Sequence, residues 1–170
     1  MPEPEIVDAD LSGGCQCGAV RFHVTMQPFG MHYCHCRMCQ KAFGSFFAPL
    51  FHVPVGRFEI TRGDLAIFMS SDIAERGFCR DCGTPLSVHT VNDPTICVAI
   101  GSLDEPAKMV PGIQYGIEGR LPYFAVLATL PGQKSTEEDM PEKAAAIARS
   151  NHQHPDHDTA EWPLPGGFPQ

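Results

Sequence analysis

Residues 79–83 are Cys79-Arg80-Asp81-Cys82-Gly83, and residues 15–18 are Cys15-Gln16-Cys17-Gly18. A Cys-x-x-Cys segment brings two sulfur atoms together through a tight turn, and the glycine after each pair suits a backbone that must fold back. If the earlier segment is a strand, Cys15 and Cys17 point to the same face, because side chains alternate along a strand. Structural zinc sites take four ligands, commonly all cysteine. The sequence therefore predicts a closed zinc site of Cys15, Cys17, Cys79 and Cys82 that joins an early segment to a late one and contributes to folding.

A second group of cysteines lies between these segments, in Cys34-His35-Cys36-Arg37-Met38-Cys39. It offers three thiol sulfur atoms within six residues. Three protein ligands plus an open position are typical of a catalytic zinc ion. The sequence thus predicts a second, open zinc site whose catalytic ligands are Cys34, Cys36 and Cys39.

Alternatives to this assignment remain open at the level of the sequence. A histidine could close the second site as a fourth ligand, and the candidates are His32, His35 and His52. His32 is in phase with the cysteines along a strand, whereas His35 alternates away from them. A redox function for Cys79 and Cys82 would be expected near a βαβ pattern, and the sequence lacks such a pattern. Cys97 lies in an apolar run and is interpreted as a core residue.

Length and composition describe one globular domain with an extension. The chain has 170 residues, of which 43% are hydrophobic and 19% charged, and these fractions are typical of globular proteins. No apolar run approaches the roughly 20 residues that span a bilayer, and the acidic N-terminus lacks the form of a signal peptide. Eight cysteines without an export signal indicate metal ligands in a reducing cytoplasm. The net charge of −8 disfavours nucleic acid as a partner, and we expect no association with membranes.

The pattern of residues predicts an all-β fold of short strands. Alternating or β-rich runs separated by glycines occur at Ala19–Thr25, Phe46–Phe51, Phe58–Thr61, Ala66–Ser70, Glu75–Phe78, Leu86–Thr90 and Ile96–Ile100. A short helix is expected at Arg37–Ala42. The best helical segment is Thr136–Ser150, where Asp139 and Glu142 resemble a capping box around Pro141.

Two zones follow from these observations. Residues 1–131 carry every cysteine and are expected to form the zinc-binding domain, while residues 132–170 form a C-terminal helix and a tail rich in proline and glycine. We expect Trp162, Leu164 and Phe168 to hold the tail against the domain or against a second subunit, which suggests a homodimer. The tail histidines are interpreted as surface residues, and they are His152, His154 and His157.

The order and spacing of these groups resemble the glutathione-dependent formaldehyde-activating family, which includes the centromere protein V group. The segments that carry the resemblance are Gly13–Val20, Cys34–Lys41, Gly44, Gly63–Leu65, Ser70–Ser71, Arg76–Leu86 and Gly101–Asp104. The resemblance runs from about Gly13 to about Pro131. It implies the Mss4-like β-tent, a fold of short antiparallel strands around zinc. It also implies the same division into a structural four-cysteine site and a catalytic three-cysteine site.

The resemblance implies an activity as well. Members of the family join glutathione to formaldehyde and reverse that reaction, so the chain is expected to be a carbon–sulfur lyase acting on a thiol–aldehyde adduct. Two positions depart from the family pattern near the expected substrate region: Gln114 stands near a usual histidine, and Tyr123 replaces a usual tryptophan. These differences concern the identity of the substrate.

Simple chemistry favours activation of the thiol. A free thiol with a pKa near 8.5 is mostly protonated at neutral pH, and coordination to zinc would deprotonate it. Three thiolates on Zn²⁺ leave a net charge of −1, which weakens its action as a Lewis acid. We therefore expect nearby cations to assist, and Arg37 and Lys41 could bind substrate carboxylates.

Two other functions are consistent with the same residues. A purely structural zinc could stabilise a binding module without catalysis. A methionine sulfoxide reductase of a related fold would need a reactive cysteine on a late strand, and Cys97 is the only spare one.

Overall fold

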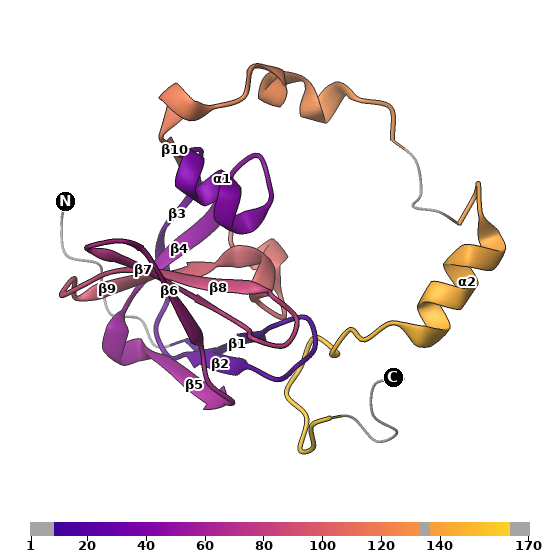
Figure 1. Ribbon diagram of the computed structural model, residues 1–170, viewed down its shortest axis with the longest axis horizontal. Helices are drawn as coiled ribbons and strands as arrows, with labels where there is room; N and C mark the ends of the chain where they lie inside the picture. The colour runs from indigo at the N-terminus through magenta and orange to yellow at the C-terminus, as the bar shows by residue number, and fades with distance from the viewer. Residues whose placement is uncertain (1–8, 133–136, 164–170) are drawn as a thin grey trace.

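The computed structural model describes residues 9–132 and 137–163. Within them the chain is mostly β-sheet, arranged as two sheets (Figure 1). The smaller sheet has the order β1-β2-β5 and consists of β1 (Leu11–Gly14), β2 (Arg21–Val24) and β5 (Phe58–Arg62). The larger has the order β10-β3-β4-β9-β8-β7-β6 and consists of β3 (Phe29–Cys34), β4 (Ala48–Pro54), β6 (Ala66–Ser71), β7 (Ala74–Phe78), β8 (Pro85–Thr90), β9 (Thr95–Ala99) and β10 (Ile113–Tyr115). Neighbouring strands are antiparallel, except that β10 runs parallel to β3.

Helices are few in the described residues. The α-helices are α1 (Arg37–Phe43), directly after β3, and α2 (Pro141–Ser150) in the C-terminal part. Short 3₁₀ segments are η1 (Val55–Arg57), η2 (Ile100–Ser102), η3 (Pro106–Lys108), η4 (Ile117–Gly119) and η5 (Pro122–Thr129). None of the described helices has both the length and the hydrophobicity required to cross a bilayer.

The predominance of β-structure expected from the sequence is confirmed, and each predicted strand corresponds to an observed one. Strands β1, β3 and β10 lie outside the runs predicted from alternation. The segment of β1 is Leu-Ser-Gly-Gly, and β3 contains Gly30 at φ +59° beside an irregularity in its pairing with β4, so neither shows a clear alternation. The C-terminal helix begins at Pro141 with Met140 as its N-cap, so the predicted capping box around Asp139 is wrong.

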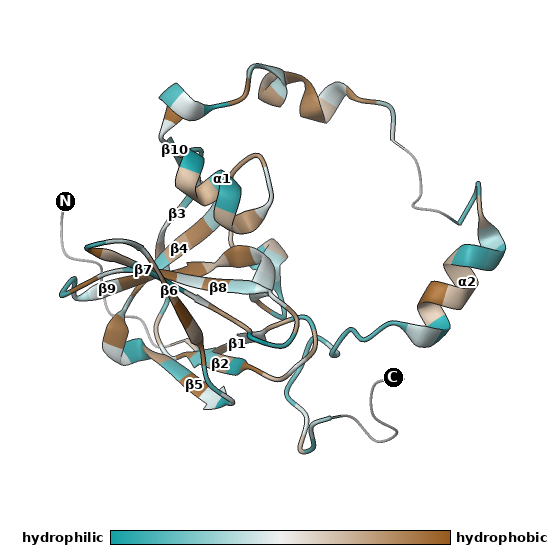
Figure 2. Ribbon diagram, in the orientation of Figure 1, coloured by the Kyte–Doolittle hydropathy of each residue, from teal (hydrophilic) through white to brown (hydrophobic). Residues whose placement is uncertain are grey.

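The larger sheet carries an apolar layer on each face. Alternation along β4 sends Phe51 and Val53 to the main core, which they share with Val98 of β9. The other face of β4 presents Ala48 and Leu50, which pack with cysteines and with residues of α1. Figure 2 shows brown, hydrophobic segments alternating with hydrophilic ones along the strands. The second, smaller apolar layer is where the candidate catalytic cysteines lie.

The C-terminal tail returns to the β-domain. From β10 the chain makes a wide arc through η5 and α2 and then comes back beside β1 and β2 (Figure 1). There the indole Nε1 of Trp162 donates to the carbonyl of Cys17 at 2.8 Å, and His154 N donates to Gln16 O at 2.7 Å. Docking of Trp162 on the domain is therefore confirmed, whereas Leu164 and Phe168 lie outside the described residues. The surface interpretation of His154 is wrong, since only 3% of it is exposed.

A buried ion pair joins the late part of the domain to β2. Arg21 Nη1 donates to Asp104 Oδ1 at 2.8 Å, and the two side chains are 3% and 9% exposed. Burial would raise the pKa of Asp104, but its hydrogen bonds with Arg21 and Ser12 hold that pKa below its usual value. The ionised form of Asp104 is therefore the form that stabilises the fold.

We predict that Asp104→Asn lowers the free energy of unfolding by about 3 kcal/mol at pH 7, because the buried guanidinium of Arg21 loses its buried carboxylate and keeps only the more exposed Asp158. The contribution is present above the pKa of an unfolded aspartate, about 3.9, and is lost as the pH falls through the lower folded value. Urea denaturation at several pH values measures the difference. Asp158→Asn is the matched control, since Asp158 also pairs with Arg21 but is 45% exposed, and it should cost less than about 1 kcal/mol. Equal losses in the two variants would contradict the prediction.

Candidate metal centres

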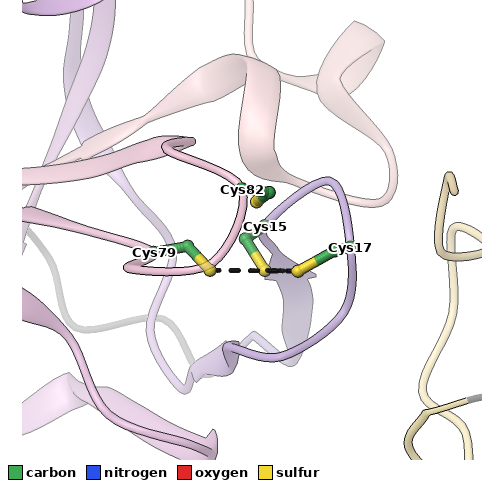
Figure 3. A group of neighbouring side chains, drawn as sticks. All are labelled: Cys15, Cys17, Cys79 and Cys82. Atoms are coloured by element: carbon green, nitrogen blue, oxygen red, sulfur yellow. Dashed lines mark hydrogen bonds between the residues drawn. The ribbon is translucent and has the colours of Figure 1, made fainter. Parts of the chain in front are cut away.

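The first group of cysteines comes from two loops at one end of the molecule. Cys15 and Cys17 lie in the β1–β2 loop, and Cys79 and Cys82 lie in the β7–β8 turn. Their four sulfur atoms are within 4.8 Å of one another, and the side chains converge on one point (Figure 3). The sulfur atoms of Cys15 and Cys17 are 3.6 Å apart, and those of Cys17 and Cys79 are 3.9 Å apart. Segments more than sixty residues apart thus present four sulfur atoms to one point, a donor set of the kind that structural zinc takes.

Tight turns, rather than strand alternation, bring these sulfur atoms together. The β1 strand ends at Gly14, so the expectation that Cys15 and Cys17 share the face of a strand is wrong. Instead Gly18 N donates to Cys15 O at 3.1 Å, and Gly83 N donates to Cys79 O at 2.9 Å. The two glycines have φ values of +80° and +77°, which glycine adopts readily. A hydrogen-bonded turn that ends in a glycine at positive φ therefore presents each pair.

The sulfur atoms of this group have unequal proton affinities. Burial raises the pKa of Cys17 and raises that of Cys79 to about 11. Burial also acts on Cys82, but hydrogen bonds from Thr84 outweigh it and lower the pKa of Cys82 to about 6. A doubly charged cation would stabilise all four thiolates together. The donor set and its partial burial thus fit a structural zinc ion.

The second group lies where β3 passes into α1. Cys34 ends β3, Cys36 is the N-cap of α1, and Cys39 is in its first turn. Their sulfur atoms are within 4.8 Å of one another. Cys39 N donates to Cys36 Sγ at 3.4 Å, so that sulfur also caps the helix. Here too the pair Cys34 and Cys36 converges through a turn and not along a strand, because Cys36 lies beyond the end of β3.

A later segment packs against this turn. His35 N donates to Tyr115 O at 2.8 Å, which continues the β10–β3 pairing. A Cβ on Gly116 would lie 2.8 Å from Cys36 N, and one on Gly119 would lie 2.8 Å from His35 O. Substitution of either glycine would push the segment away. The chain thus shields the backbone around Cys36 on this side.

His35 is held away from the three cysteines. Its ring is fully buried, packs edge-on against Phe124 and has Nε2 3.0 Å from Gln114 Oε1. Gln114 therefore contacts the cysteine turn through His35. His35 is absent from the group of potential metal ligands formed by the three cysteines.

A buried arginine lies against Cys39. Arg76 of β7 is 8% exposed, and its Nη2 donates to Cys39 Sγ at 3.6 Å. Its Nε and Nη1 are buried with no hydrogen-bond partner among the described residues. A hydrogen bond from Cys34, assisted by Arg76, lowers the pKa of Cys39 to about 5 although burial opposes the shift. Arg76 thus compensates negative charge on the three sulfur atoms.

Arg76 also lines a cavity together with the two cations expected to bind substrate. Arg37 and Lys41, both exposed on α1, face Phe68 and Arg76 across a cavity of about 350 Å³. Three positively charged side chains thus line one cavity, although the chain has a net charge of −8. Sequence reasoning missed Arg76. The available signal was alternation along β7, which places Arg76 on the same face as Ala74 and Phe78 and on the opposite face from Glu75 and Gly77.

The other histidines considered as a fourth ligand lie elsewhere. His32 and His52 form a third group with Cys97, and none of the three belongs to the group of Cys34, Cys36 and Cys39. Burial raises the pKa of Cys97 to about 12, so it is a protonated thiol at neutral pH. Cys97 is partly buried and 3.4 Å from His52 Nδ1, so its interpretation as a simple core residue is incomplete.

Comparisons with known proteins bear on the family and the fold of the chain. Residues 10–117 match the family model described as glutathione-dependent formaldehyde-activating enzyme. A protein of Phaeosphaeria nodorum, named provisionally as such an enzyme, is 32% identical over an alignment of 93 positions that covers 51% of this chain and 49% of that protein. The chain thus matches about half the length of this relative. A Rhodobacter sphaeroides protein of known crystal structure is 22% identical with a TM-score of 0.50, covering 61% of this chain and 98% of that one, and it shows a similar fold.

Proposed function

The chain belongs to the glutathione-dependent formaldehyde-activating enzyme family, and from this premise we propose that it is a zinc-dependent carbon–sulfur lyase that forms and cleaves S-(hydroxymethyl)glutathione. The observation that carries the proposal is the group of Cys34, Cys36 and Cys39 with a buried arginine beside it. We propose further that residues 1–131 form a Mss4-like β-tent with a second, closed zinc site of Cys15, Cys17, Cys79 and Cys82, and that residues 132–170 are an extension.

The reaction requires a thiolate and a proton acceptor. A bond forms between the thiol sulfur and the aldehyde carbon, the π bond of the carbonyl breaks, and the proton from sulfur ends on the new hydroxyl oxygen. A zinc ion at Cys34, Cys36 and Cys39 would supply the positive charge that favours the thiolate over the thiol. Three protein sulfur atoms leave one position for a substrate sulfur.

The protein's own residues would tune this position. Three thiolates outweigh the charge of a zinc ion, and the guanidinium of Arg76 on Cys39 Sγ brings the local charge back toward zero. The segment after β10 protects the backbone at Cys36 and holds His35 out of the way. Arg37 and Lys41 at the rim of the adjacent cavity would bind the carboxylates of glutathione.

The test is the rate at which formaldehyde is consumed by glutathione with and without the zinc-loaded protein. A saturable acceleration over the uncatalysed condensation supports the lyase. Tight binding of glutathione with no acceleration would support the alternative, a zinc-stabilised binding module without catalysis.

We predict that the double variant Arg37→Gln, Lys41→Gln weakens binding of glutathione about tenfold, the equivalent of roughly 1.4 kcal/mol for lost charge-assisted hydrogen bonds. Binding of the uncharged thiol 2-mercaptoethanol should be unchanged, because it has no carboxylate. Isothermal titration of both thiols measures the difference. Arg57→Gln, in η1, is the matched control for loss of positive charge. An equal loss for both thiols would contradict recognition of the carboxylates.

A further inference from the structure

The third group of potential ligands spans three neighbouring strands of the larger sheet. His32 is on β3, His52 on β4 and Cys97 on β9, and the sheet order places these strands side by side. His52 pairs directly with Cys97, while His32 pairs with Leu50, two residues before His52. Side chains two residues apart on a strand share a face, so all three point to the same side. Their potential ligand atoms are within 4.8 Å of one another.

The hydrogen bond of His32 prepares it as a ligand. Its Nδ1 is 2.7 Å from Gly30 O, and because a carbonyl only accepts, Nδ1 carries the proton. The lone pair is therefore on Nε2. Histidines that bind metals commonly donate their other ring nitrogen to a carbonyl or carboxylate in this way. Gly30 also leaves room for the ring of His52, since a Cβ at position 30 would lie 3.0 Å from Cδ2 of that ring.

Aromatic neighbours hold the two imidazoles. The rings of His32 and His52 are 5.1 Å apart and nearly stacked, with an angle of 29° between their planes. Tyr115 packs edge-on against His32, and Phe29 stacks on His52. The sulfur of Cys97 is 3.4 Å from Nδ1 of His52. Two restrained imidazoles and a thiol therefore converge, and small side-chain rotations would bring them onto one ion.

We propose that His32, His52 and Cys97 form a third metal site that takes a divalent cation of the zinc type. Two nitrogens and one sulfur form a borderline-soft donor set suited to zinc, with the fourth position open. A bound Zn²⁺ would deprotonate the Cys97 thiol, and two neutral imidazoles with one thiolate would then leave the ion with a net charge of +1, in contrast to −1 at a three-thiolate site. The third site would thus attract anionic ligands. His32 and Cys34 are about 7 Å apart along β3, so the third site and the three-cysteine group are neighbours on one face of the sheet.

The test is zinc content per chain after saturation with zinc and gel filtration. His52→Ala and Cys97→Ala should each lose one zinc ion relative to the unaltered protein, and the combination with Cys36→Ser should lose a second. The matched control is His89→Ala, a histidine on β8 of the same sheet that contacts Glu75 and Asp93, and it should lose none. Thermal unfolding checks that each variant is folded.

Cobalt substitution gives a second, spectroscopic readout. The intensity of the thiolate–cobalt charge-transfer band should fall in Cys36→Ser and fall again in Cys36→Ser with His52→Ala, and the contribution of the four-cysteine group should remain. Equal zinc content in His52→Ala and the unaltered protein would overturn the proposal. A single ion lost alike in Cys36→Ser, His52→Ala and their combination would also overturn it, because one shared ion would then explain both groups. Loss of lyase activity in a variant tests only the proposed function. The zinc content per chain tests the third metal site independently of activity.

Discussion

Cys82→Ser is expected to lower the free energy of unfolding by at least about 3 kcal/mol, because loss of a structural metal removes binding energy that contributes directly to folding. Cys82 contributes one of four converging sulfur atoms from the β7–β8 turn, and the pair in the β1–β2 loop contributes two more. Without a metal ion the two loops are connected by weak contacts between thiols and by a hydrogen bond from Gln16 N to Thr84 Oγ1 at 3.0 Å. The pKa of Cys79 is about 11 and that of Cys17 is also raised, so these thiols stay protonated when no cation is bound.

The consequence extends to the C-terminal tail. Trp162 and His154 hydrogen-bond to the backbone of the same loop that carries Cys15 and Cys17. A Cβ on Gly18 would lie 2.1 Å from Cδ2 of His154, so the tail packs directly on the backbone of this loop. Release of the loop in Cys82→Ser should therefore also expose the segment around Trp162 to proteases.

Urea denaturation, zinc content and limited proteolysis measure these effects together. Treatment of the unaltered protein with a chelator should reduce its stability to that of Cys82→Ser, whereas the variant should not respond further. The control is Cys36→Ser, which removes a sulfur from the other cysteine group. Stability that is unchanged in Cys82→Ser and insensitive to chelation would show that the four-cysteine group does not hold a structural metal.

Local spacing predicted which cysteines converge, but it did not predict how. The Cys-x-x-Cys turn before Gly83 was correctly anticipated, because turn chemistry is local. Cys15 and Cys17 were placed on a strand, and the structure puts them in a turn that ends with Gly18 at positive φ. A two-residue spacing alone does not distinguish a strand from such a turn, because both bring the sulfur atoms to one side.

Contacts between distant strands could not be predicted in the same way. His32 was in phase with Cys34, yet its neighbours in the structure are His52 and Cys97, which depend on the strand order β3-β4-β9. Arg76 likewise meets Cys39 only because α1 covers the face of the sheet on which β7 presents it. A single sequence specifies alternation along each strand, but strand order arises from packing of the whole domain.

Cys36→Ser should abolish the acceleration of the glutathione–formaldehyde reaction and leave the protein folded. The expected loss is at least about a hundredfold, comparable to removal of a major electrostatic contribution to catalysis. Cys36 is also the N-cap of α1, where its sulfur accepts from Cys39 N at 3.4 Å. Serine is among the preferred N-cap residues, so its hydroxyl oxygen can replace the sulfur in this bond. The helix should therefore survive while one ligand of the open site is lost.

Comparison with Cys36→Ala separates the two roles of this residue. Alanine removes both the ligand and the cap, so Cys36→Ala should lose the same activity and, in addition, about 1 kcal/mol of stability relative to Cys36→Ser. Initial rates of adduct formation and urea denaturation of both variants provide the measurements. An active Cys36→Ser would contradict a catalytic zinc site at this turn. If Cys36→Ser instead lost as much stability as Cys82→Ser, both cysteine groups would be structural, and the binding module would become the better account of the fold.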